Sequence, residues 1–339
     1  MDLRIAISMG DPGGIGPEVI VKALADESRR ARAGWITVGS RAALDRAAHD
    51  AGWHPAWRSE SWERDNNTPR AGEIVVLDDG TNNWRPEVSR DNGEASFQYV
   101  ERAIALAQRE AADPWHAHAV VTGPISKQAW ALAGHTKYPG HTELFAERFG
   151  VRDFAMMFMS DVMNVILATV HVPLARVPGL LTTAGVLRAI TLGAAGLEAR
   201  GFLKPRIAVC GLNPHAGEHG LLGTEDDWII APAIAQAAAL GLNVAGPFPG
   251  DTVFLDAIDR ASRPRRFDLV VAMYHDQGLI PFKLLARDSG VNVTVGLPTV
   301  RTSPDHGTAF DIAGKNVADA GSMAAACDLA IEMAGARLR

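Results

Sequence analysis

The chain has 339 residues, of which 47% are hydrophobic and 21% are charged, and its formal net charge is −6. This length suits two domains of ordinary size, and the composition is that of a globular protein, which excludes disordered and fibrous classes. The negative charge gives no general attraction to nucleic acids or anionic membranes, so we expect small-molecule partners, no nucleic acid and no membrane.

Two features of the sequence bear on where the protein works. Cys210 and Cys327 are too few and too far apart for a disulfide framework or a cysteine zinc site, which fits a reducing compartment. The first apolar stretch, residues 5–9, lacks the length of a signal peptide's apolar region, and no apolar run approaches the roughly 20 residues that span a bilayer. We therefore expect a cytoplasmic protein.

Short apolar runs alternate with longer helical patterns along the chain. We expect strands at residues 4–9, 35–38, 74–77, 119–122, 165–170, 207–210, 269–274 and 291–295. We expect helices at residues 16–27, 41–51, 93–112, 142–149, 184–200, 226–240 and 322–334. This alternation predicts an α/β fold with largely parallel sheets, and strands that are apolar throughout indicate helices on both sheet faces.

Three histidines follow apolar strands of the predicted sheets. His171 and His275 close two of these strands, and His215 lies a few residues after a third. Because ligands in open α/β sheets bind beyond the carboxyl ends of strands, the three imidazoles can meet at one edge. Three such ligands would hold a catalytic divalent metal and leave positions open for water or substrate. The alternative is that each histidine only hydrogen-bonds loop backbone, because this wide spacing carries no ligand signature.

The segment from Gly10 to Glu18 reads Gly-Asp-Pro-Gly-Gly-Ile-Gly-Pro-Glu and joins the first predicted strand to the first predicted helix. Its glycines and the helix N-terminus are suited to an anion, so it is either a ligand-binding turn or a purely structural one. Glu18 opposes an anion, and Val19 stands where a dinucleotide fingerprint needs its third glycine. A standard dinucleotide-binding site is therefore disfavoured here.

Further polar residues gather in two other parts of the chain. His141 and Thr142 open a predicted helix, with Thr142 as a possible N-cap, or they bind substrate. Lys283, Asn292 and Arg301 follow the strand that His275 closes, and lysine and arginine together suit a phosphate group. Each of these charges alone is more often a solvated surface residue.

Six ordered motifs carry a resemblance to a known family. They are Gly-Asp-Pro-Gly-Gly-Ile-Gly-Pro-Glu from Gly10, Thr-Gly-Pro-Ile-Ser-Lys from Thr122, Gly-His-Thr-Glu from Gly140, Asn-Pro-His-Ala-Gly-Glu from Asn213, Tyr-His-Asp-Gln-Gly from Tyr274 and Arg-Thr-Ser-Pro-Asp-His-Gly-Thr-Ala from Arg301. The chain therefore resembles, over nearly its whole length, the 4-hydroxythreonine-4-phosphate dehydrogenase (PdxA) family, which includes D-threonate and D-erythronate 4-phosphate dehydrogenases.

The resemblance implies a homodimer with its active site between two domains. It implies a divalent metal, such as Zn²⁺, Mg²⁺ or Co²⁺, bound by His171 and His215 of one subunit and by the partner subunit's His275. Contacts to a small phosphorylated hydroxy acid are implied for His141, Thr142, Lys283, Asn292 and Arg301. Asp251 is implied to lie near the substrate, so it and Lys283 are the candidate catalytic residues. Lys283 either neutralises phosphate or assists proton transfer. Asp276 either orients the imidazole of its neighbour His275 or is an exposed loop carboxylate.

The family's reaction, as the resemblance implies it, is oxidation of a secondary alcohol by NAD or NADP. The substrate would be 4-phosphooxy-L-threonine, and decarboxylation would then give 3-amino-2-oxopropyl phosphate in pyridoxal phosphate biosynthesis. Residues 306–315 also resemble the cofactor loop of isopropylmalate and isocitrate dehydrogenases, which implies that Gly307, Asp311 and Gly314 bind the cofactor.

The same likeness implies two α/β/α domains. Residues 1–134 with 296–339 would form one domain, and residues 135–295 would form a central domain with the metal histidines and the dimer interface.

Other activities stay open. Asp11 stands where biosynthetic members often have glutamate, and the segment between Asp251 and His275 looks longer than in some of them. D-threonate or D-erythronate 4-phosphate and the cis-dihydrodiol of terephthalate are therefore alternative substrates. A non-catalytic metabolite-binding protein is a hypothesis of another class, and coenzyme A-dependent acyl transfer is a third, although it gives no role to the three histidines.

Overall fold

The computed structural model describes residues 3–61, 68–82, 84–259 and 263–338. The chain divides into two compact units: unit 1 is Met1–Arg152 with Leu297–Arg339, and unit 2 is Asp153–Gly296. In each unit a mostly parallel sheet is flanked by helices, so the predicted α/β class is confirmed.

Residues 135–152, which we assigned to the central domain, pack in unit 1. The ring of His135 stacks on Phe97 with the ring centres 3.6 Å apart. Arg148 pairs with Glu101 across the same helix surface. These contacts attach the segment to the long helix of unit 1.

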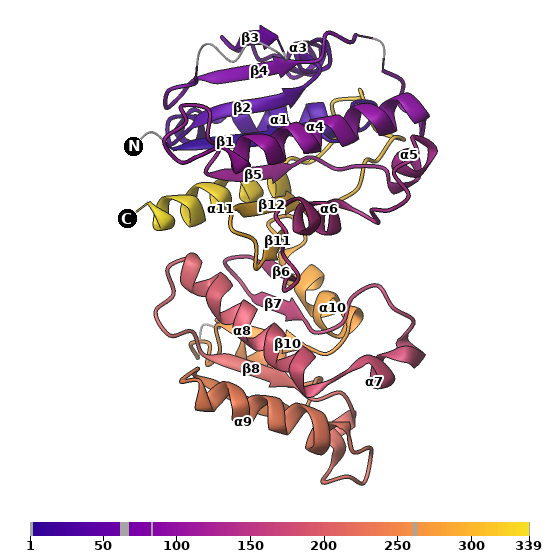
Figure 1. The fold of residues 1–339 in the computed structure, drawn as a ribbon, viewed down its shortest axis with the longest axis vertical. Helices are drawn as coiled ribbons and strands as arrows, with labels where there is room; N and C mark the ends of the chain where they lie inside the picture. The colour runs from indigo at the N-terminus through magenta and orange to yellow at the C-terminus, as the bar shows by residue number, and fades with distance from the viewer. Residues whose placement is uncertain (1–2, 62–67, 83, 260–262, 339) are drawn as a thin grey trace. The chain divides into compact units, whose positions relative to one another are not determined.

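Unit 1 contains six neighbouring strands of a sheet, and every described pair among them is parallel. In spatial order its strands are β3 (Arg58–Ser61), β4 (Ile74–Asp78), β2 (Gly34–Gly39), β1 (Arg4–Ser8), β5 (Ala119–Thr122) and β12 (Val300–Pro304). Its helices are α1 (Gly16–Leu24), α2 (Glu27–Arg30), α3 (Arg41–Asp50), α4 (Arg90–Gln108), α5 (Lys127–Leu132), α6 (His141–Arg148) and α11 (Gly321–Arg337). Helix α4 crosses β1, β2 and β5 on one face, while α11 packs on β5 and β12 and contacts α1 (Figure 1).

Three helices of unit 1 begin at a serine that caps them. Ser40, Ser89 and Ser126 precede α3, α4 and α5, and each hydroxyl accepts a hydrogen bond from the backbone N–H three residues later. Such a cap satisfies one of the N–H groups that a helix start leaves without a partner and stabilises the helix by about 1 kcal/mol.

Unit 2 contains a mixed sheet. In spatial order its strands are β11 (Val291–Val295), β6 (Ala155–Met159), β7 (Asn164–Leu167), β10 (Leu269–Ala272), β8 (Ile207–Cys210) and β9 (Val244–Phe248). Strand β6 is antiparallel to both neighbours, and the remaining described pairs are parallel. Its helices are η1 (Leu174–Arg176), α7 (Val177–Leu180), α8 (Thr183–Ala199), η2 (Pro214–Gly217), the π-helix η3 (Asp226–Ile230), α9 (Ala231–Ala239), η4 (Val253–Asp256) and α10 (His275–Ala286).

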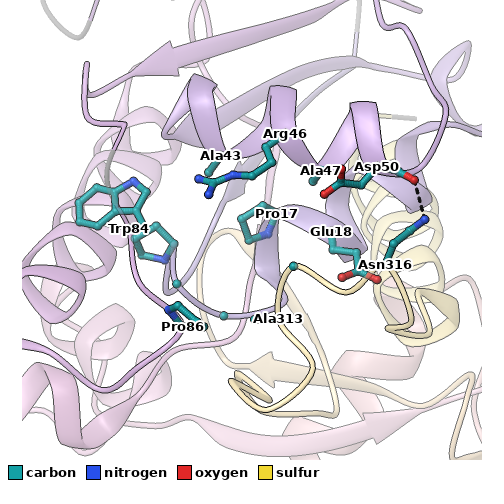
Figure 2. Close-up of a pocket in the computed structure, with 14 residues that line it drawn as sticks. Pro17, Glu18, Ala43, Arg46, Ala47, Asp50, Trp84, Pro86, Ala313 and Asn316 are labelled. Atoms are coloured by element: carbon teal, nitrogen blue, oxygen red, sulfur yellow. Dashed lines mark hydrogen bonds between the residues drawn. The ribbon is translucent and has the colours of Figure 1, made fainter.

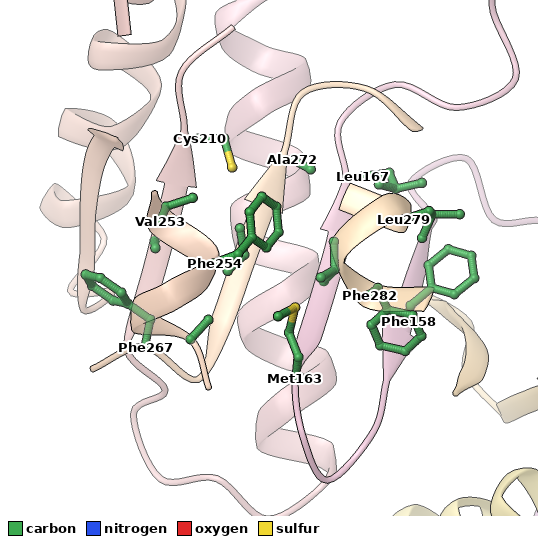
Figure 3. Packing of buried hydrophobic residues seen from close by; sticks show 14 of the residues in the cluster. Phe158, Met163, Leu167, Cys210, Val253, Phe254, Phe267, Ala272, Leu279 and Phe282 are labelled. Carbon is green, nitrogen blue, oxygen red and sulfur yellow. The ribbon is translucent and has the colours of Figure 1, made fainter. Parts of the chain in front are cut away.

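One hydrophobic core of unit 2 lies between the sheet, α10 and η4 (Figure 3). Phe282 of α10 packs against Phe158 of β6 with the ring centres 5.6 Å apart. Phe254 of η4 and Phe267 extend this core beside β8 and β10. The core anchors α10, the helix that begins at His275.

Among the described residues no single helix is long and apolar enough to cross a membrane; only Leu174–Leu180 taken together with Thr183–Ala199 passes that test, and this pair is bent by 97°.

Candidate functional site

Arg301 lies buried in unit 1, where β12 runs beside β5. Its side chain is only 2% exposed, and Nη2 donates a hydrogen bond of 2.7 Å to Oγ1 of Thr122. The guanidinium carbon lies 5.9 Å from the ring centre of Phe145 in α6. Burial lowers the pKa of Arg301 to about 10, while the field of Glu143 acts in the opposite direction. A guanidinium held this way is suited to a charge-assisted contact with an anion.

His141 and Thr142 are the first two residues of α6, and both follow Gly140. The predicted N-cap at Thr142 is wrong, because Gly140 occupies that position and no side chain caps the helix. The ring of His141 meets Trp130 edge-on at 5.7 Å, and its Nε2 is buried without a hydrogen-bond partner among the described residues.

The environment of His141 disfavours its charged form. Burial holds the pKa of this imidazole well below its usual range, and the positive charges of Arg301 and Lys127 lower it further. A neutral imidazole can still donate or accept one hydrogen bond at Nε2. His141 and Arg301, two of the five substrate contacts that the family resemblance implies, therefore lie close enough to interact electrostatically within unit 1.

The turn between β1 and α1 is pressed against other backbone segments. Gly10 has φ 77°, and a Cβ there would lie 2.3 Å from the carbonyl oxygen of Pro124, so only glycine fits. Asp11 is fully buried and its Oδ1 accepts a hydrogen bond of 3.0 Å from the N–H of Gly13. Its Oδ2 forms no hydrogen bond of ordinary geometry with the described residues, although the side chain of Asn92 lies close enough to lower the pKa of Asp11. Burial raises the pKa of Asp11 to about 6, although the Gly13 hydrogen bond lowers it in part.

A cavity of about 210 Å³ opens beside this turn in unit 1 (Figure 2). Gly13 and Gly14 line it from the turn, and Ala313 and Gly314 line it from the loop after β12. The two segments are joined by a hydrogen bond of 2.9 Å from the N–H of Ile15 to the carbonyl oxygen of Thr308. Two stretches that the sequence analysis treated separately therefore form one pocket.

The remaining walls of the cavity carry an aromatic ring, a guanidinium group and a carboxylate. Figure 2 shows the Trp84 indole and the Arg46 guanidinium on one side and Glu18 near Asn316 on the other. Glu18 is 5% exposed, and its Oε1 accepts hydrogen bonds from Lys22 Nζ and from the N–H of Ala318. Its Oε2 has no hydrogen-bond partner among the described residues. The negative charge that we expected to repel an anion is thus partly compensated by Lys22.

The cavity includes one of the three predicted cofactor residues. Gly314 lines it, whereas Gly307 and Asp311 are not among its lining residues. Sequence reasoning missed Arg46 and Trp84, because a single arginine in a helix and a single tryptophan in a polar segment look like ordinary surface residues. Only the fold shows that they face Glu18 across a hollow.

The three predicted metal histidines all lie in unit 2. His171 follows β7, which ends at Leu167, and His275 is the first residue of α10. The ring centres of His171 and His275 are 5.5 Å apart. Oδ1 of Asp276 lies 2.7 Å from Nδ1 of His275. Within the part of the chain that the structure describes, no group of three or more histidine, cysteine, aspartate or glutamate side chains is placed to hold a metal.

His215 lies in η2 with an exposed side chain and a left-handed backbone, φ 53°. The carboxylate of Asp226, which is fully buried, accepts hydrogen bonds from the N–H groups of Leu212 and Asn213 and from Nδ2 of Asn213. Asp226 thereby holds the segment that leads into His215. It was not predicted, because nothing in the run Glu-Asp-Asp distinguishes it from a solvated acidic turn.

The other predicted residues of unit 2 lie on three different elements. Lys283 is exposed on α10, eight positions after His275, or about 12 Å along the helix axis. Asn292 is on β11, and its Oδ1 is buried without a hydrogen-bond partner among the described residues. Asp251 is exposed in the turn between β9 and η4.

Comparison with known proteins gives one consistent result. The model of the family described as "Pyridoxal phosphate biosynthetic protein PdxA" matches residues 31–330. The 4-hydroxythreonine-4-phosphate dehydrogenase of Beijerinckia indica subsp. indica is 43% identical over 336 residues, covering 98% of this chain and 96% of that relative. The D-threonate 4-phosphate dehydrogenase of Salmonella typhimurium is 44% identical over 337 residues, covering 97% and 98%. A crystal structure of 4-hydroxythreonine-4-phosphate dehydrogenase from Klebsiella pneumoniae matches with a TM-score of 0.83 at 40% identity, covering 98% of each chain.

Proposed function

Because the chain belongs to the family of the pyridoxal phosphate biosynthetic protein PdxA, we propose that it is an NAD- or NADP-dependent dehydrogenase of 4-phosphooxy-L-threonine. It oxidises the secondary alcohol, and the resulting β-keto acid decarboxylates to 3-amino-2-oxopropyl phosphate. The observation that carries this proposal is the end-to-end similarity to a dehydrogenase of that name, at 43% identity over 98% of the chain.

A second candidate is oxidation of D-threonate 4-phosphate. It is favoured by the Salmonella typhimurium relative, which is as similar to this chain, at 44% identity, as the first. The two substrates share a phosphorylated hydroxy-acid skeleton, so the same anion-binding residues serve both. Relative kcat/KM values for the two substrates decide between them.

The substrate oxyanion is assigned to Arg301, His141 and Thr142 of unit 1. Support comes from the buried Arg301 guanidinium and from His141 Nε2, which is buried without a hydrogen-bond partner among the described residues. Further substrate contacts are assigned to Lys283 and Asn292 of unit 2. Lys283 and Asp251 are the candidate catalytic residues, and the exposure of both side chains leaves them accessible to substrate.

The metal is assigned to His171, His215 and His275. Two imidazoles on one tetrahedral zinc have ring centres roughly 5 Å apart, and the 5.5 Å between His171 and His275 in one chain fits that arrangement. Because the described part of one chain holds no group of three possible ligands, this proposal takes the remaining ligand from a second copy in a homodimer. The resemblance implied His171 and His215 from one subunit, whereas the pair close together here is His171 and His275.

The residues around His275 support this chemistry. When bound, a divalent ion supplies Lewis acidity that favours loss of the alcohol proton and stabilises the charge formed on decarboxylation. Asp276 lies against Nδ1 of His275 and so directs Nε2 away from it. Lys283, two helical turns further along α10, can neutralise an anionic group or move a proton.

The nicotinamide cofactor is assigned, at its nucleotide end, to the cavity beside the β1–α1 turn. The Trp84 indole offers a flat surface, and Oε2 of Glu18 offers an acceptor for a hydroxyl or amine donor. The backbone of Gly13, Gly14 and Gly314 allows close approach of a ligand. The cytoplasmic location expected from the sequence stays a prediction.

The test is NAD(P)H absorbance with a panel of phosphorylated and unphosphorylated hydroxy acids, measured with and without a chelator. We expect turnover of 4-phosphooxy-L-threonine or D-threonate 4-phosphate that the chelator abolishes and that added Zn²⁺, Mg²⁺ or Co²⁺ restores. No turnover on any substrate, with tight binding of one of them, would instead support a metabolite-binding protein. Turnover that survives complete metal removal would contradict the metal assignment.

A further inference from the structure

Lys127, the first residue of α5, lies on the side of unit 1 where His141 and Arg301 gather. A Cβ built on Gly140, the residue before His141, would lie 3.6 Å from Cε of Lys127, so the lysine side chain runs along the start of α6. Trp130, three positions later in α5, contacts the His141 ring at 5.7 Å. Because residues three apart share a helix face, the face of α5 that carries Lys127 is the one turned toward His141.

The ammonium group of Lys127 does not stabilise the described part of the fold through any polar contact. Its side chain is exposed, and it makes no hydrogen bond or ion pair with any residue that the structure describes. The carboxylate of Glu143 lies on the same side, with its Oε2 3.7 Å from the same built Cβ of Gly140. Within the described part of the chain it forms no ion pair with Lys127. Elsewhere in unit 1, Lys137 pairs with Glu147 and Lys22 pairs with Glu18. Lys127 differs from both.

The charges around His141 favour an anion. The positive charges of Arg301 and Lys127 both act on its imidazole, and the carboxylate of Glu143 is the opposing charge. His141 itself stays neutral near neutral pH, because burial and these two cations disfavour its protonation. The positive charges here are those of Arg301 and Lys127, and the one opposing charge is that of Glu143. Nε2 of His141 adds a buried nitrogen with no hydrogen-bond partner among the described residues.

We propose that Lys127 is a further binding residue for the substrate's phosphoryl group, acting together with Arg301 and His141. This inference rests on the proposed function, since it names one more contact of the same site. A phosphoryl dianion suits the set: arginine offers a planar pair of donors, lysine a mobile point charge, and the neutral imidazole one hydrogen bond. Lys127 binds the substrate and has no part in hydride or proton transfer.

The kinetic test compares Lys127→Met and Lys127→Arg with Lys137→Met, which removes the same charge from a lysine whose partner is Glu147. We expect Lys127→Met to raise the substrate KM roughly tenfold or more, as for loss of a charge-assisted hydrogen bond, with kcat little changed. Lys127→Arg restores most of the loss, and Lys137→Met behaves as wild type. A loss confined to kcat, or an equal loss in both methionine variants, overturns the proposal.

A binding measurement separates this proposal from the proposed function. Inorganic phosphate is titrated into wild type and Lys127→Met while the His141 imidazole resonance is followed by NMR, with acetate in a parallel titration. We expect phosphate to shift the wild-type resonance and to bind at least about tenfold more weakly to the variant. Removing the lysine charge also raises the pKa of His141.

The possible results of the titration are distinct. If wild type turns over no hydroxy acid, the proposed function fails while the phosphate titration still tests Lys127. Equal phosphate affinity in wild type and Lys127→Met overturns the inference even in an active enzyme. Weaker binding of acetate with unchanged binding of phosphate also overturns it, because Lys127 would then contact a carboxylate.

Discussion

Asp11→Asn is expected to stabilise unit 1 at neutral pH and to do so less under acid conditions. Burial raises the pKa of Asp11 from 3.8 to about 6 in the folded protein. The folded state therefore holds this proton more tightly than the unfolded state, and the free energy of unfolding falls as pH rises between these two values. Asparagine keeps the oxygen that accepts from Gly13 but carries no charge to bury.

The magnitude follows from the size of the shift. A shift of about two pKa units corresponds to a destabilisation of the folded protein by about 3 kcal/mol. This destabilisation is present in full above the folded pKa of Asp11 and absent below its unfolded pKa. From about pH 4.5 to about pH 7.5, the free energy of unfolding of the variant relative to wild type should rise by about 2 kcal/mol. The assay is urea unfolding followed by tryptophan fluorescence, since every tryptophan except Trp228 belongs to unit 1.

Asp26→Asn is the matched control. Asp26 is exposed, and hydrogen bonds from Ser28 and Arg29 lower its pKa, so its contribution to stability is present at neutral pH and is lost as pH falls. The difference between this variant and wild type should therefore change with pH in the opposite direction. A stability difference for Asp11→Asn that is the same at both pH values would refute the reasoning.

Three further outcomes are expected. His275→Ala should lose bound metal, measured by elemental analysis, while its unfolding midpoint stays near that of wild type, because this side chain is 37% exposed; full metal occupancy would exclude it as a ligand. Arg301→Lys should raise the substrate KM about tenfold with less effect on kcat, since lysine keeps the charge and loses the planar fork; a selective kcat loss would point to another role. Glu18→Gln should raise the KM for NAD(P) roughly five- to thirtyfold without changing the substrate KM, if Oε2 accepts from the cofactor.

Most of the apolar strands were predictable, because a buried β-branched run fits a sheet that helices cover on both faces. Strands β6 and β9 have no such run and were not predicted. Strands β1, β2, β4, β5, β8, β10 and β11 lie where buried β-branched runs predicted them. Strands β3 and β12 were not predicted, because Arg-Ser-Glu-Ser and Val-Arg-Thr-Ser-Pro have no apolar run; they are held by pairing with β4 and β5. Helix α10 was missed because Gly278 and Pro281 lie inside it, yet the core around Phe282 stabilises it.

For the candidate site, the sequence predicted several of the residues that take part, but not how they are packed or which of them are buried. The sequence predicted His141 and Arg301 as substrate contacts, but burial and the Thr122 contact come from how α6 and β12 pack around β5. Lys127 lies in a recognised motif and still gave no signal, since an exposed lysine looks the same with or without a ligand. The cavity walls at Arg46 and Trp84 are separated by a long stretch of chain, and no local pattern joins them.

The backbone around His215 is informative beyond its place after a strand. His215, Ala216, Glu218 and His219 all have left-handed backbones, with φ between 46° and 57°, and such a residue costs about 1 kcal/mol or more when it is not glycine. Glycine already occupies three further positive-φ positions of this turn, Gly217, Gly220 and Gly223, so the chain uses glycine freely here. The left-handed conformation is therefore a property of the whole turn, shared by Ala216, Glu218 and His219. Asp226 holds the start of the turn through buried hydrogen bonds, so the exposed imidazole of His215 projects from a constrained backbone, which is compatible with the metal role proposed for it.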